Sequence, residues 1–513
     1  MRDIKNKQFR VNVYLLLLLY VFVISLCCSK WSPLLGANVI SDDAIWYCIG
    51  NGIVNSHVAH VELADHKGLY LFFLYAAGNL ISPNSFIGIF LVWVVIFFLC
   101  SILVLRIIEI YTSCSKPSAI IGAIVFLALS LCVSLEGGVI NTEQAAMLCQ
   151  LISFYFILNY SNRGEIEHPT KYAFVHGITA AVVFELRANM VLMWGGIFLV
   201  FACRLIKNKS YKNLLDNIIY GIFGFGVGLA PMLIYCFATK SIHELVNQEF
   251  IFNVAYSSKG NYLEKVLAFL SYKSCIWLII MLFFSSYLVI KKSGMFRYEK
   301  ILFILMEILE ILSLSMGKQL AHYYIALCVF LLPFVIFISI VFDRILNRRI
   351  FILTLLVGFV FTITLNLRLP IYVLHEYGYR KSPSYLIEED VKEILSEMNK
   401  YQIGDSDFFV SFGDHFHPQA FYAYKHVVPP TKWFYIPAIS FDQYPEPYED
   451  QKKELQTGDY EAYVIKYMDT ENRIILPGIS DEDNHIIKSR LEKDYRDVII
   501  SQNLSYHLYI KKR

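Results

Sequence analysis

Residues 41–68 read SDDAIWYCIGNGIVNSHVAHVELADHKG, and this stretch decides how the rest of the chain is interpreted. A long apolar run precedes it, and a series of further apolar segments follows it. Ionisable groups held next to a bilayer are costly, and they usually serve a function. We therefore expect this loop to carry the chemistry of the protein and the remaining chain to hold the loop in place. The ionisable side chains of the loop include Asp42, Asp43, Glu62, Asp65, His66 and Lys67.

The composition predicts a polytopic membrane protein. Of the 513 residues, 56% are hydrophobic and only 17% are charged, whereas soluble proteins usually contain about 25% charged residues. The formal net charge of +2 indicates neither a nucleic-acid partner nor a strongly acidic one. The 11 cysteines all lie at or before Cys328, mostly inside apolar runs and without metal-ligand spacing. We therefore expect neither a disulfide nor a zinc site.

Eleven apolar runs have about the length needed to cross roughly 30 Å of hydrocarbon. Basic residues cluster before the first run and in every second connection after it, as the positive-inside rule requires of cytoplasmic segments. The N-terminus is therefore predicted to be cytoplasmic, with the first loop (about 31–85) and the C-terminal tail outside. Residues 69–81 are short for a span and are expected to form an interfacial or re-entrant helix. The eleven runs lie near 11–30, 86–110, 118–135, 144–160, 172–186, 188–206, 216–238, 264–290, 300–314, 320–341 and 349–368.

The composition changes near residue 369, where the long apolar runs stop. We expect residues 1–368 to form a membrane domain and residues 369–513 to form a small α/β domain outside the membrane. Alternating helices and strands are predicted in this tail, without a glycine-rich phosphate loop. The helices are expected at 379–400, 417–425 and 481–494, and the strands at 407–412, 460–467, 498–501 and 506–510.

The adjacent acids Asp42 and Asp43 follow the first span after a short loop. A carboxylate in this position could act as a general base that takes a proton from an attacking hydroxyl group. Equally, the two acids could be a solvated pair that caps a helix beginning near Ala44.

A second candidate group is Asp65-His66-Lys67-Gly68, at the start of the short apolar helix. Lys67 is suited to hold a phosphate oxygen as a point charge, and the N-terminus of the helix would add its dipole. Gly68 would let the backbone approach closely. A lysine that simply extends its charge to the membrane surface is the alternative interpretation, and His66 alone is a weak indicator.

Further polar groups are predicted on the same outer side of the membrane. Glu143 lies between the third and fourth runs, and Arg187 lies at the turn after the fifth. Lys318 and His322 precede or begin the tenth run. Each of these could be ordinary loop polarity, but together they place acids and cations on one face.

The order of these motifs resembles that of bacterial membrane glycosyltransferases of the GT-C superfamily, close to the protein O-mannosyltransferase and aminoarabinose-transferase type (family 39). In that pattern the first acid corresponds to Asp42, the aromatic residue to Trp46, the glycine to Gly50 and the DHKG segment to residues 65–68. The usual proline after DHKG is Leu69 here, and the usual Tyr-x-Asp is HVE at 60–62. Further matches are NTE at 141–143, LRAN at 186–189, GKQLAHYYIALCVFLLP at 317–333 and FHPQAFYAYKHVVPPTKWFY at 416–435.

The resemblance implies a fold of roughly eleven to thirteen helices, a polyprenyl-phosphate sugar donor and an inverting transfer. The acceptor would be a glycan, lipid or protein of the cell envelope, outside the bacterial cytoplasmic membrane. Asp42 would be the base, with Asp43 as its neighbour or replacement, and Lys67 and Arg187 would hold the donor phosphate. No cofactor is required, although the acids leave a divalent metal ion open. The residues expected to bind donor, sugar or acceptor are Glu62, Asp65, His66, Lys67, Glu143, Arg187, Lys318, His322 and Tyr323.

Two other functions are compatible with the sequence. A flippase, polymerase or transporter for lipid-linked saccharides would need ionisable groups inside its spans, for which Glu185, Glu307 and Glu310 are candidates. No repeat symmetry of the kind found in many transporters is visible in the sequence. A non-catalytic scaffold whose tail binds a partner is the third interpretation, and in that case changing Asp42 or Lys67 would not alter glycan composition.

The predicted topology can be tested through the tail, residues 369–513. Protease added to intact spheroplasts is expected to cleave this tail, because no membrane would separate it from the protease. A cytoplasmic marker protein in the same cells is the control and should stay intact. Protection of the tail until the cells are lysed would contradict the topology.

Overall fold

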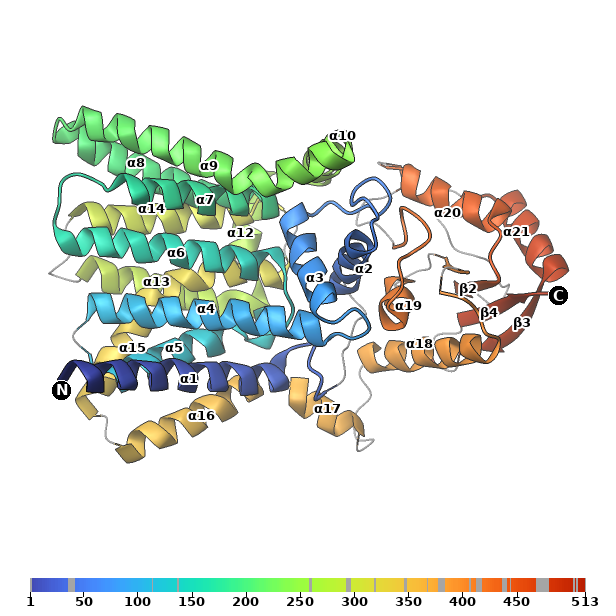
Figure 1. The fold of residues 1–513 in the computed structure, drawn as a ribbon, viewed down its shortest axis with the longest axis horizontal. Helices are drawn as coiled ribbons and strands as arrows, with labels where there is room; N and C mark the ends of the chain where they lie inside the picture. Colours follow the sequence, from blue (N-terminus) through green and yellow to red (C-terminus); the bar gives the residue numbers. More distant parts are fainter. Residues whose placement is uncertain are drawn as a thin grey trace.

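The computed structural model has two parts, a bundle of long helices and a small C-terminal sheet with helices around it (Figure 1). Both parts are formed by elements that the sequence pattern largely predicts. The structure describes residues 2–35, 42–112, 114–135, 138–257, 261–291, 297–317, 320–345, 348–366, 368–376, 383–405, 407–411, 418–435, 441–442, 444–466, 479–501, 503 and 506–512.

The long helices run side by side, and each lies where the sequence predicts an apolar run (Figure 1). Six helical segments of the described chain are long and apolar enough on their own to cross a membrane, and three shorter helices are also apolar. The number of spans remains a prediction. The long helices are α1 (Arg2–Cys28), α4 (Ile87–Tyr111), α5 (Lys116–Ser130), α6 (Thr142–Arg163), α7 (Thr170–Leu186), α8 (Leu192–Lys207), α9 (Tyr211–Thr239), α13 (Ile276–Lys291), α14 (Arg297–Leu314), α15 (Leu332–Ile345) and α16 (Arg348–Asn366).

Several of the predicted runs are not continuous α-helices. The run at 118–135 ends in a short 3₁₀ turn, η1 (Val133–Leu135), and the run at 188–206 begins with another, η2 (Ala188–Val191). The run at 264–290 breaks after α12 (Tyr262–Leu270), where the hydroxyl of Ser271 donates to the carbonyl of Leu267 and a short 3₁₀ turn leads into α13. The run at 320–341 begins as a buried 3₁₀-helix, η5 (Ala321–Leu331), which continues into α15. Pro333 is the second residue of α15, directly after η5.

Several long helices turn apolar side chains outward. In the 18-residue apolar stretch of α9 only 17% of the residues are buried inside the protein, and in that of α16 only 11% are. Proteins in water rarely expose apolar surface on this scale, so these helices form a surface suited to lipid. The inner face of α9 packs closely on α7, since a Cβ atom on Gly224 would lie 2.1 Å from the carbonyl oxygen of Phe174. Small residues allow this close approach of helices in membranes.

Two short helices, α2 (Asp42–Val54) and α3 (Leu69–Ile81), lie at one end of the bundle, between the long helices and the C-terminal part (Figure 1). We refer to this end as the loop end. In Figure 1, α3 runs across the direction of the long helices rather than along it. Its 13 residues span about 20 Å, which is less than the hydrocarbon thickness of a bilayer. Its length and direction therefore suit an interfacial helix.

The C-terminal part is built on a four-stranded sheet with the order β1-β2-β4-β3. β1 (Phe408–Val410) and β2 (Ala462–Lys466) are parallel, whereas β4 (Tyr506–Lys511) is antiparallel to both β2 and β3 (Tyr495–Ile500). The sequence pattern does not predict α20 because this helix is mostly polar, and its buried face of Pro447, Tyr448, Gln451 and Leu455 includes a proline and a glutamine. The helices of this part are α18 (Pro383–Lys400), α19 (Pro418–Lys425), α20 (Glu446–Thr457) and α21 (Asp481–Asp494), and α17 (Arg368–Glu376) precedes them.

The C-terminal part packs directly on α2. The hydroxyl of Tyr47 lies 2.7 Å from Nδ1 of His426, and Nδ2 of Asn51 donates to the carbonyl oxygen of His426 at 3.1 Å. One continuous core of buried apolar side chains extends from the long helices through α2 and α3 to α19. The amino-acid composition therefore changes at residue 369, but the buried apolar core is shared by the segments before and after this residue.

Candidate functional site

A pocket of about 220 Å³ opens at the loop end of the bundle, between four segments that are distant in the sequence. Four of the predicted site residues, His66, Lys67, Arg187 and Tyr323, line this one pocket. Two cations, several carboxyl and amide groups and aromatic rings thus surround a space large enough for a phosphate-sized group. The lining residues are His66, Lys67, Gly68, Phe184, Glu185, Leu186, Arg187, Ala188, Asn189, Glu249, Phe250, Asn253, Val254, Met316, Gly317 and Tyr323.

Arg187 is fixed in the wall of the pocket from three sides. Its Nη1 pairs with the carboxylate of Glu143, and its Nε donates to Oδ1 of Asn189 at 3.2 Å. The guanidinium carbon lies 3.5 Å from the ring centre of Tyr323, a cation–π contact. The side chain of Glu143 is only 1% exposed, and a buried carboxylate requires such a partner. The contact of Glu143 is therefore with Arg187, and Glu143 is not among the lining residues.

Asp65 is buried and joins three parts of the chain. Its Oδ2 accepts a hydrogen bond from Nε1 of Trp46 at 2.9 Å, and its Oδ1 accepts one from the hydroxyl of Tyr435 at 2.8 Å. The backbone N–H of His66 also donates to Oδ1, and the His66 ring lies 2.9 Å from it. Burial alone would raise the pKa of Asp65, but the charges of His66 and Lys67 and the hydrogen bonds from His66 and Tyr435 lower it to about 2. Asp65 is therefore a carboxylate that holds the loop together.

The next residues are held against the connection that follows α9. The ring of His66 stacks on Phe252 with ring centres 5.3 Å apart, and its carbonyl oxygen accepts from Nδ2 of Asn253 at 2.9 Å. At Gly68 a Cβ atom would lie 1.9 Å from the carbonyl oxygen of Glu185. No other residue fits there, which explains why glycine follows Lys67.

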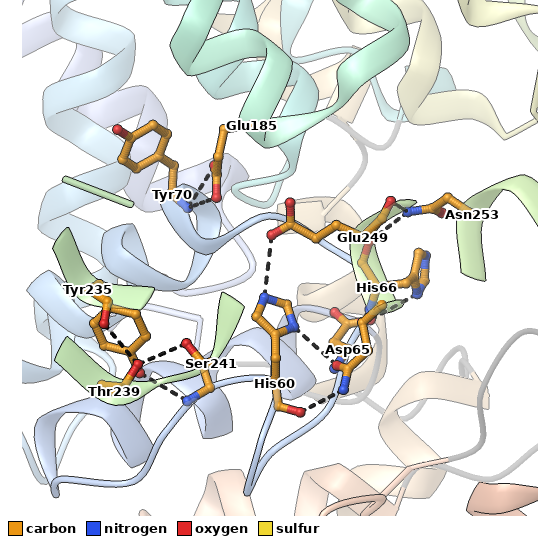
Figure 2. Close-up of polar contacts among 12 residues, drawn as sticks. His60, Asp65, His66, Tyr70, Glu185, Tyr235, Thr239, Ser241, Glu249 and Asn253 are labelled. Carbon is orange, nitrogen blue, oxygen red and sulfur yellow. Dashed lines mark hydrogen bonds and ion pairs between the residues drawn. The ribbon is translucent and has the colours of Figure 1, made fainter. Parts of the chain in front are cut away.

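The N-terminus of α3 is already occupied by a side chain of the protein. The backbone N–H of Tyr70 donates to both carboxylate oxygens of Glu185, at 2.9 and 3.1 Å (Figure 2). The expectation that this helix end adds its dipole to a bound phosphate is therefore wrong for the Tyr70 amide, because an acid from α7 takes that place. Lys67 and Arg187 remain as the cations of the pocket.

No sequence motif points to the connection after α9, which forms α10 (Ile242–Leu245), a π-helix η3 (Val246–Ile251) and α11 (Phe252–Ser257). Gln248 in η3 donates through Nε2 to the carbonyl oxygen of His60 at 2.6 Å. Its Oε1 lies 3.2 Å from the backbone N of Asp65 and 3.1 Å from Nδ1 of His60. A π-turn often marks a functional site, but it has no simple sequence signature.

Asp42 and Asp43 form the first turn of α2, and neither lines the pocket. Asp42 is exposed, whereas Asp43 is 1% exposed. Burial, followed by the charges of Asp65 and Asp42, raises the pKa of Tyr435. Burial and the charges of Asp43 and Asp42 likewise raise the pKa of Tyr75. Both acids thus lie near buried tyrosines at the edge of the loop end.

The remaining predicted residues have other positions. Glu62 is exposed and accepts a hydrogen bond from the backbone N–H of Val58 within its own turn, so it does not line the pocket. His322 is half-buried, with its ring 4.8 Å from that of Tyr323. Lys318 lies outside the described residues.

The sequence predicts neither a disulfide nor a zinc site and leaves a divalent metal ion open. Within the described part of the chain, no group of three or more His, Cys, Asp or Glu side chains is arranged to hold a metal ion. No disulfide joins any of the 11 cysteines, all of which are described.

No protein-family model matches the sequence, and a search of curated proteins finds no match. Solved structures do match it over nearly its whole length. ArnT from Cupriavidus metallidurans in the apo state has a TM-score of 0.61 at 10% identity, and the match covers 98% of each chain. The chain has the GT-C fold. ArnT bound to undecaprenyl phosphate matches with a TM-score of 0.56, 10% identity and the same coverage.

The arabinofuranosyltransferase AftD from Mycobacteria matches with a TM-score of 0.51 at 11% identity, over 98% of this chain and 40% of AftD. The coarser part of the predicted fold class, a helical bundle of the GT-C kind with a small C-terminal sheet, is confirmed. The eleven spans and the interfacial helices of the first loop stay predictions. Likeness at this level of identity concerns the path of the backbone.

The contact between Tyr435 and Asp65 can be tested by Tyr435→Phe, which removes one donor from a buried carboxylate. We expect a loss of about 2 kcal/mol in stability at pH 7, measured as a lower thermal midpoint in detergent. The lowered pKa of Asp65 stabilises the fold above its ordinary value of 3.8, and this contribution is lost as the pH falls from there to about 2. The deficit of the variant should therefore shrink at acidic pH.

Tyr444→Phe is the matched control, since the hydroxyl of Tyr444 donates to Glu446, which is 44% exposed at its side chain. Equal midpoints for the Tyr435 and Tyr444 variants at pH 7 would contradict the role given to the buried contact.

Proposed function

We propose that this protein is a glycosyltransferase that takes a sugar from a polyprenyl-phosphate donor and transfers it to an acceptor outside the cytoplasmic membrane. The observation that carries the proposal is the convergence of Lys67 and Arg187 on one pocket at the loop end of a lipid-facing bundle. An anionic head group attached to a long apolar chain fits such a place. ArnT, which has the same fold, has been crystallised bound to undecaprenyl phosphate.

The two cations hold the donor phosphate in complementary ways. Lys67 provides a compact charge on a flexible stem, whereas the guanidinium of Arg187 is held in one orientation by Glu143 and Tyr323. A preorganised cation stabilises charge that develops on the leaving group without reorganising during the reaction. The phosphate becomes more negative as it leaves, and this is when the pocket binds it most strongly.

The acceptor hydroxyl is activated by Asp42, with Asp43 as its neighbour. The acceptor oxygen attacks the anomeric carbon of the sugar, and Asp42 takes the hydroxyl proton. The bond between the anomeric carbon and the phosphate oxygen breaks, and its electron pair leaves with the polyprenyl phosphate. Attack from the face opposite the leaving group inverts the anomeric configuration. The exposure of Asp42 at the start of α2 suits an acceptor that arrives from the aqueous side.

The remaining site residues support these groups. His66 and Tyr323 line the pocket and contact donor or sugar, with His322 beside Tyr323. Asp65 and Glu143 act by holding the loop and Arg187 in place. Glu62 and Lys318 bind the acceptor. A divalent ion, if one takes part, enters with the substrate. Residues 369–513 cover the loop end on the outer side, and the N-terminus is cytoplasmic.

Replacing Lys67 by alanine is expected to raise the KM for the donor by about 10-fold to 100-fold, because a charge-assisted contact to phosphate contributes about 1.5–3 kcal/mol. The KM for the acceptor should change little. The measurement is release of polyprenyl phosphate by purified protein in detergent, with a panel of polyprenyl-phosphate sugars. Lys207→Ala, at the other end of α8, is the control. An unchanged donor dependence would reject the phosphate role of Lys67.

Replacing Asp42 by asparagine should abolish transfer while expression and thermal midpoint stay normal, because an amide cannot accept the hydroxyl proton. Asp216→Asn, on the first turns of α9, is the matched control. Normal glycan products from the Asp42 variant would overturn the base assignment. If wild-type protein releases polyprenyl phosphate from no donor, even with membrane extract as the source of acceptor, transport or polymerisation becomes the better interpretation.

A further inference from the structure

A second cavity lies at the end of the bundle opposite the loop end, where the chain begins (Figure 1). We call this end the far end and the space the far cavity. It has a volume of about 280 Å³, and its walls come from α4, α6, α13, α14 and α15. It shares no lining residue with the pocket that contains Lys67 and Arg187. The mechanism above therefore does not use this space.

The far cavity has about the depth of one leaflet of a membrane. On α15 its lining runs from Leu332 to Ile340, a length of about 12 Å at 1.5 Å per residue. Tyr111, the last residue of α4, lines it as well. The hydrocarbon of one leaflet is about 15 Å thick. In the predicted topology the leaflet at the far end is the cytoplasmic one.

The walls of the far cavity are apolar. Apart from the hydroxyl of Tyr111, the lining side chains consist of hydrocarbon. Protein interiors leave few spaces of this size, and an apolar cavity of about 150 Å³ stays dry and takes up apolar molecules. Phe337 lines the cavity, and its ring lies 6.2 Å from that of Phe284 on α13; both residues are 40% exposed. The cavity therefore borders the lipid-facing surface between α13 and α15, where an apolar chain can enter.

The helices α13, α14 and α15 each bring one basic residue to the far end. Each basic residue is three or four positions away from a residue that lines the cavity, and residues at this spacing lie on one face of a helix. The three cations are therefore placed one turn beyond the cavity, on the faces that line it. They are Lys291 after Leu288, Lys300 before Phe303, and Arg344 after Ile340.

These cations can bind an anion. Within the described part of the chain none of the three forms an ion pair, and Nζ of Lys300 donates to a backbone carbonyl at the end of α13 at 2.7 Å. Two acids are next to them in the chain. Asp343 is turned toward α5, where its Oδ1 accepts hydrogen bonds from the N–H of Ser115 and the hydroxyl of Ser118. Glu299 remains beside three cations, so the mouth of the cavity carries net positive charge.

We propose that the far cavity binds one acyl chain of an anionic phospholipid, with the phosphate of the head group held by Lys291, Lys300 and Arg344. Such a lipid combines the two features that the site requires, a hydrocarbon chain of leaflet length and an anion at the membrane surface. A free phosphate would leave the cavity empty, and a lipid without net charge would not balance the cations. The bound lipid fills the space between the helices and links their far ends. Its binding needs no sugar donor.

The polyprenyl-phosphate donor is a less suitable occupant. Its phosphate is assigned to the loop end, where Tyr323 lines the pocket. Leu332, the first far-cavity residue of α15, follows Tyr323 by nine positions, most of them in the 3₁₀-helix η5. At about 2.0 Å per residue the two positions are about 18 Å apart. A donor held in the pocket therefore cannot place its phosphate among the cations of the far end.

The test uses wild-type protein in detergent and a phosphatidylglycerol that carries a photoactivatable group in its acyl chain. After illumination, mass spectrometry of peptides should find the label on α13 and α15, at or beside Leu288, Ile336 and Ile340. Unlabelled phosphatidylglycerol should displace it at a concentration at least about 10-fold lower than phosphatidylcholine, because each basic residue at the head group favours an anionic lipid about 5-fold.

Three results of this experiment would overturn the proposal. The label could be found only on other segments, or the two phospholipids could displace it equally well. Stronger displacement by polyprenyl phosphate than by phosphatidylglycerol would make the cavity a second place for the donor instead.

Charge variants test the contacts of the head group. The combined substitutions Lys291→Gln, Lys300→Gln and Arg344→Gln should weaken phosphatidylglycerol binding by at least about 10-fold and leave phosphatidylcholine binding within about 2-fold of wild type.

The matched control removes three cations from the same end of the bundle, at the turn between α8 and α9. It should bind phosphatidylglycerol within about 2-fold of wild type. An equal loss in the two variants would mean that only the overall charge of this end matters, and it would overturn the site. The control substitutions are Lys207→Gln, Lys209→Gln and Lys212→Gln.

Discussion

The buried carboxylate of Asp65 is the contact on which the loop end depends. It accepts hydrogen bonds from Trp46 on α2, from His66 in its own loop and from Tyr435 in the C-terminal part. A carboxylate away from water is tolerated only when donors replace its hydration, so these segments are held at fixed positions around it. Lys67 is two residues away, and its reach into the pocket follows from this arrangement. Asp65 thus joins these three segments at one point beside the apolar core that α2, α3 and α19 share.

The main architecture could be predicted from the sequence because its apolar runs are long and its basic residues recur in alternate connections. Apolar runs of span length, with basic residues in alternate connections, identified the positions of the long helices, and the tail's strands and most of its helices followed from alternation and turns. The loop motif was also informative, since Trp46 and Asp65, quoted as separate motif positions, bond directly to each other. Lys67, Arg187 and Tyr323 were predicted from three distant segments and share one pocket. Charge in an apolar context is easy to recognise.

What could not be predicted depends on contacts between distant segments. Glu185, considered as a buried acid of a span, caps the start of α3 with its carboxylate, 115 positions away in the chain. The π-helix that carries Gln248 and Glu249 has no composition that sets it apart from an ordinary connection. α20 is mostly polar, and its buried face includes Gln451, so apolar periodicity does not reveal it. The break before α13, where Ser271 bonds back to the carbonyl of Leu267, interrupts a run that was predicted as one span. The pocket therefore carries charges of both signs. The acids Glu185 and Glu249 line it beside Lys67 and Arg187, the cations that were predicted from the sequence.

The bond between Asp65 and Tyr435 joins residues 370 positions apart, and this separation has a consequence for biosynthesis. The first loop reaches its side of the membrane early, when most of the chain has not yet been made. Until Tyr435 and Lys432 have emerged, Asp65 lacks one of its donors and the N–H of Ala64 lacks the Lys432 carbonyl that accepts it. A nascent or truncated chain would thus insert its helices without forming a working site. The order of synthesis delays the appearance of the site until the whole scaffold is in the membrane.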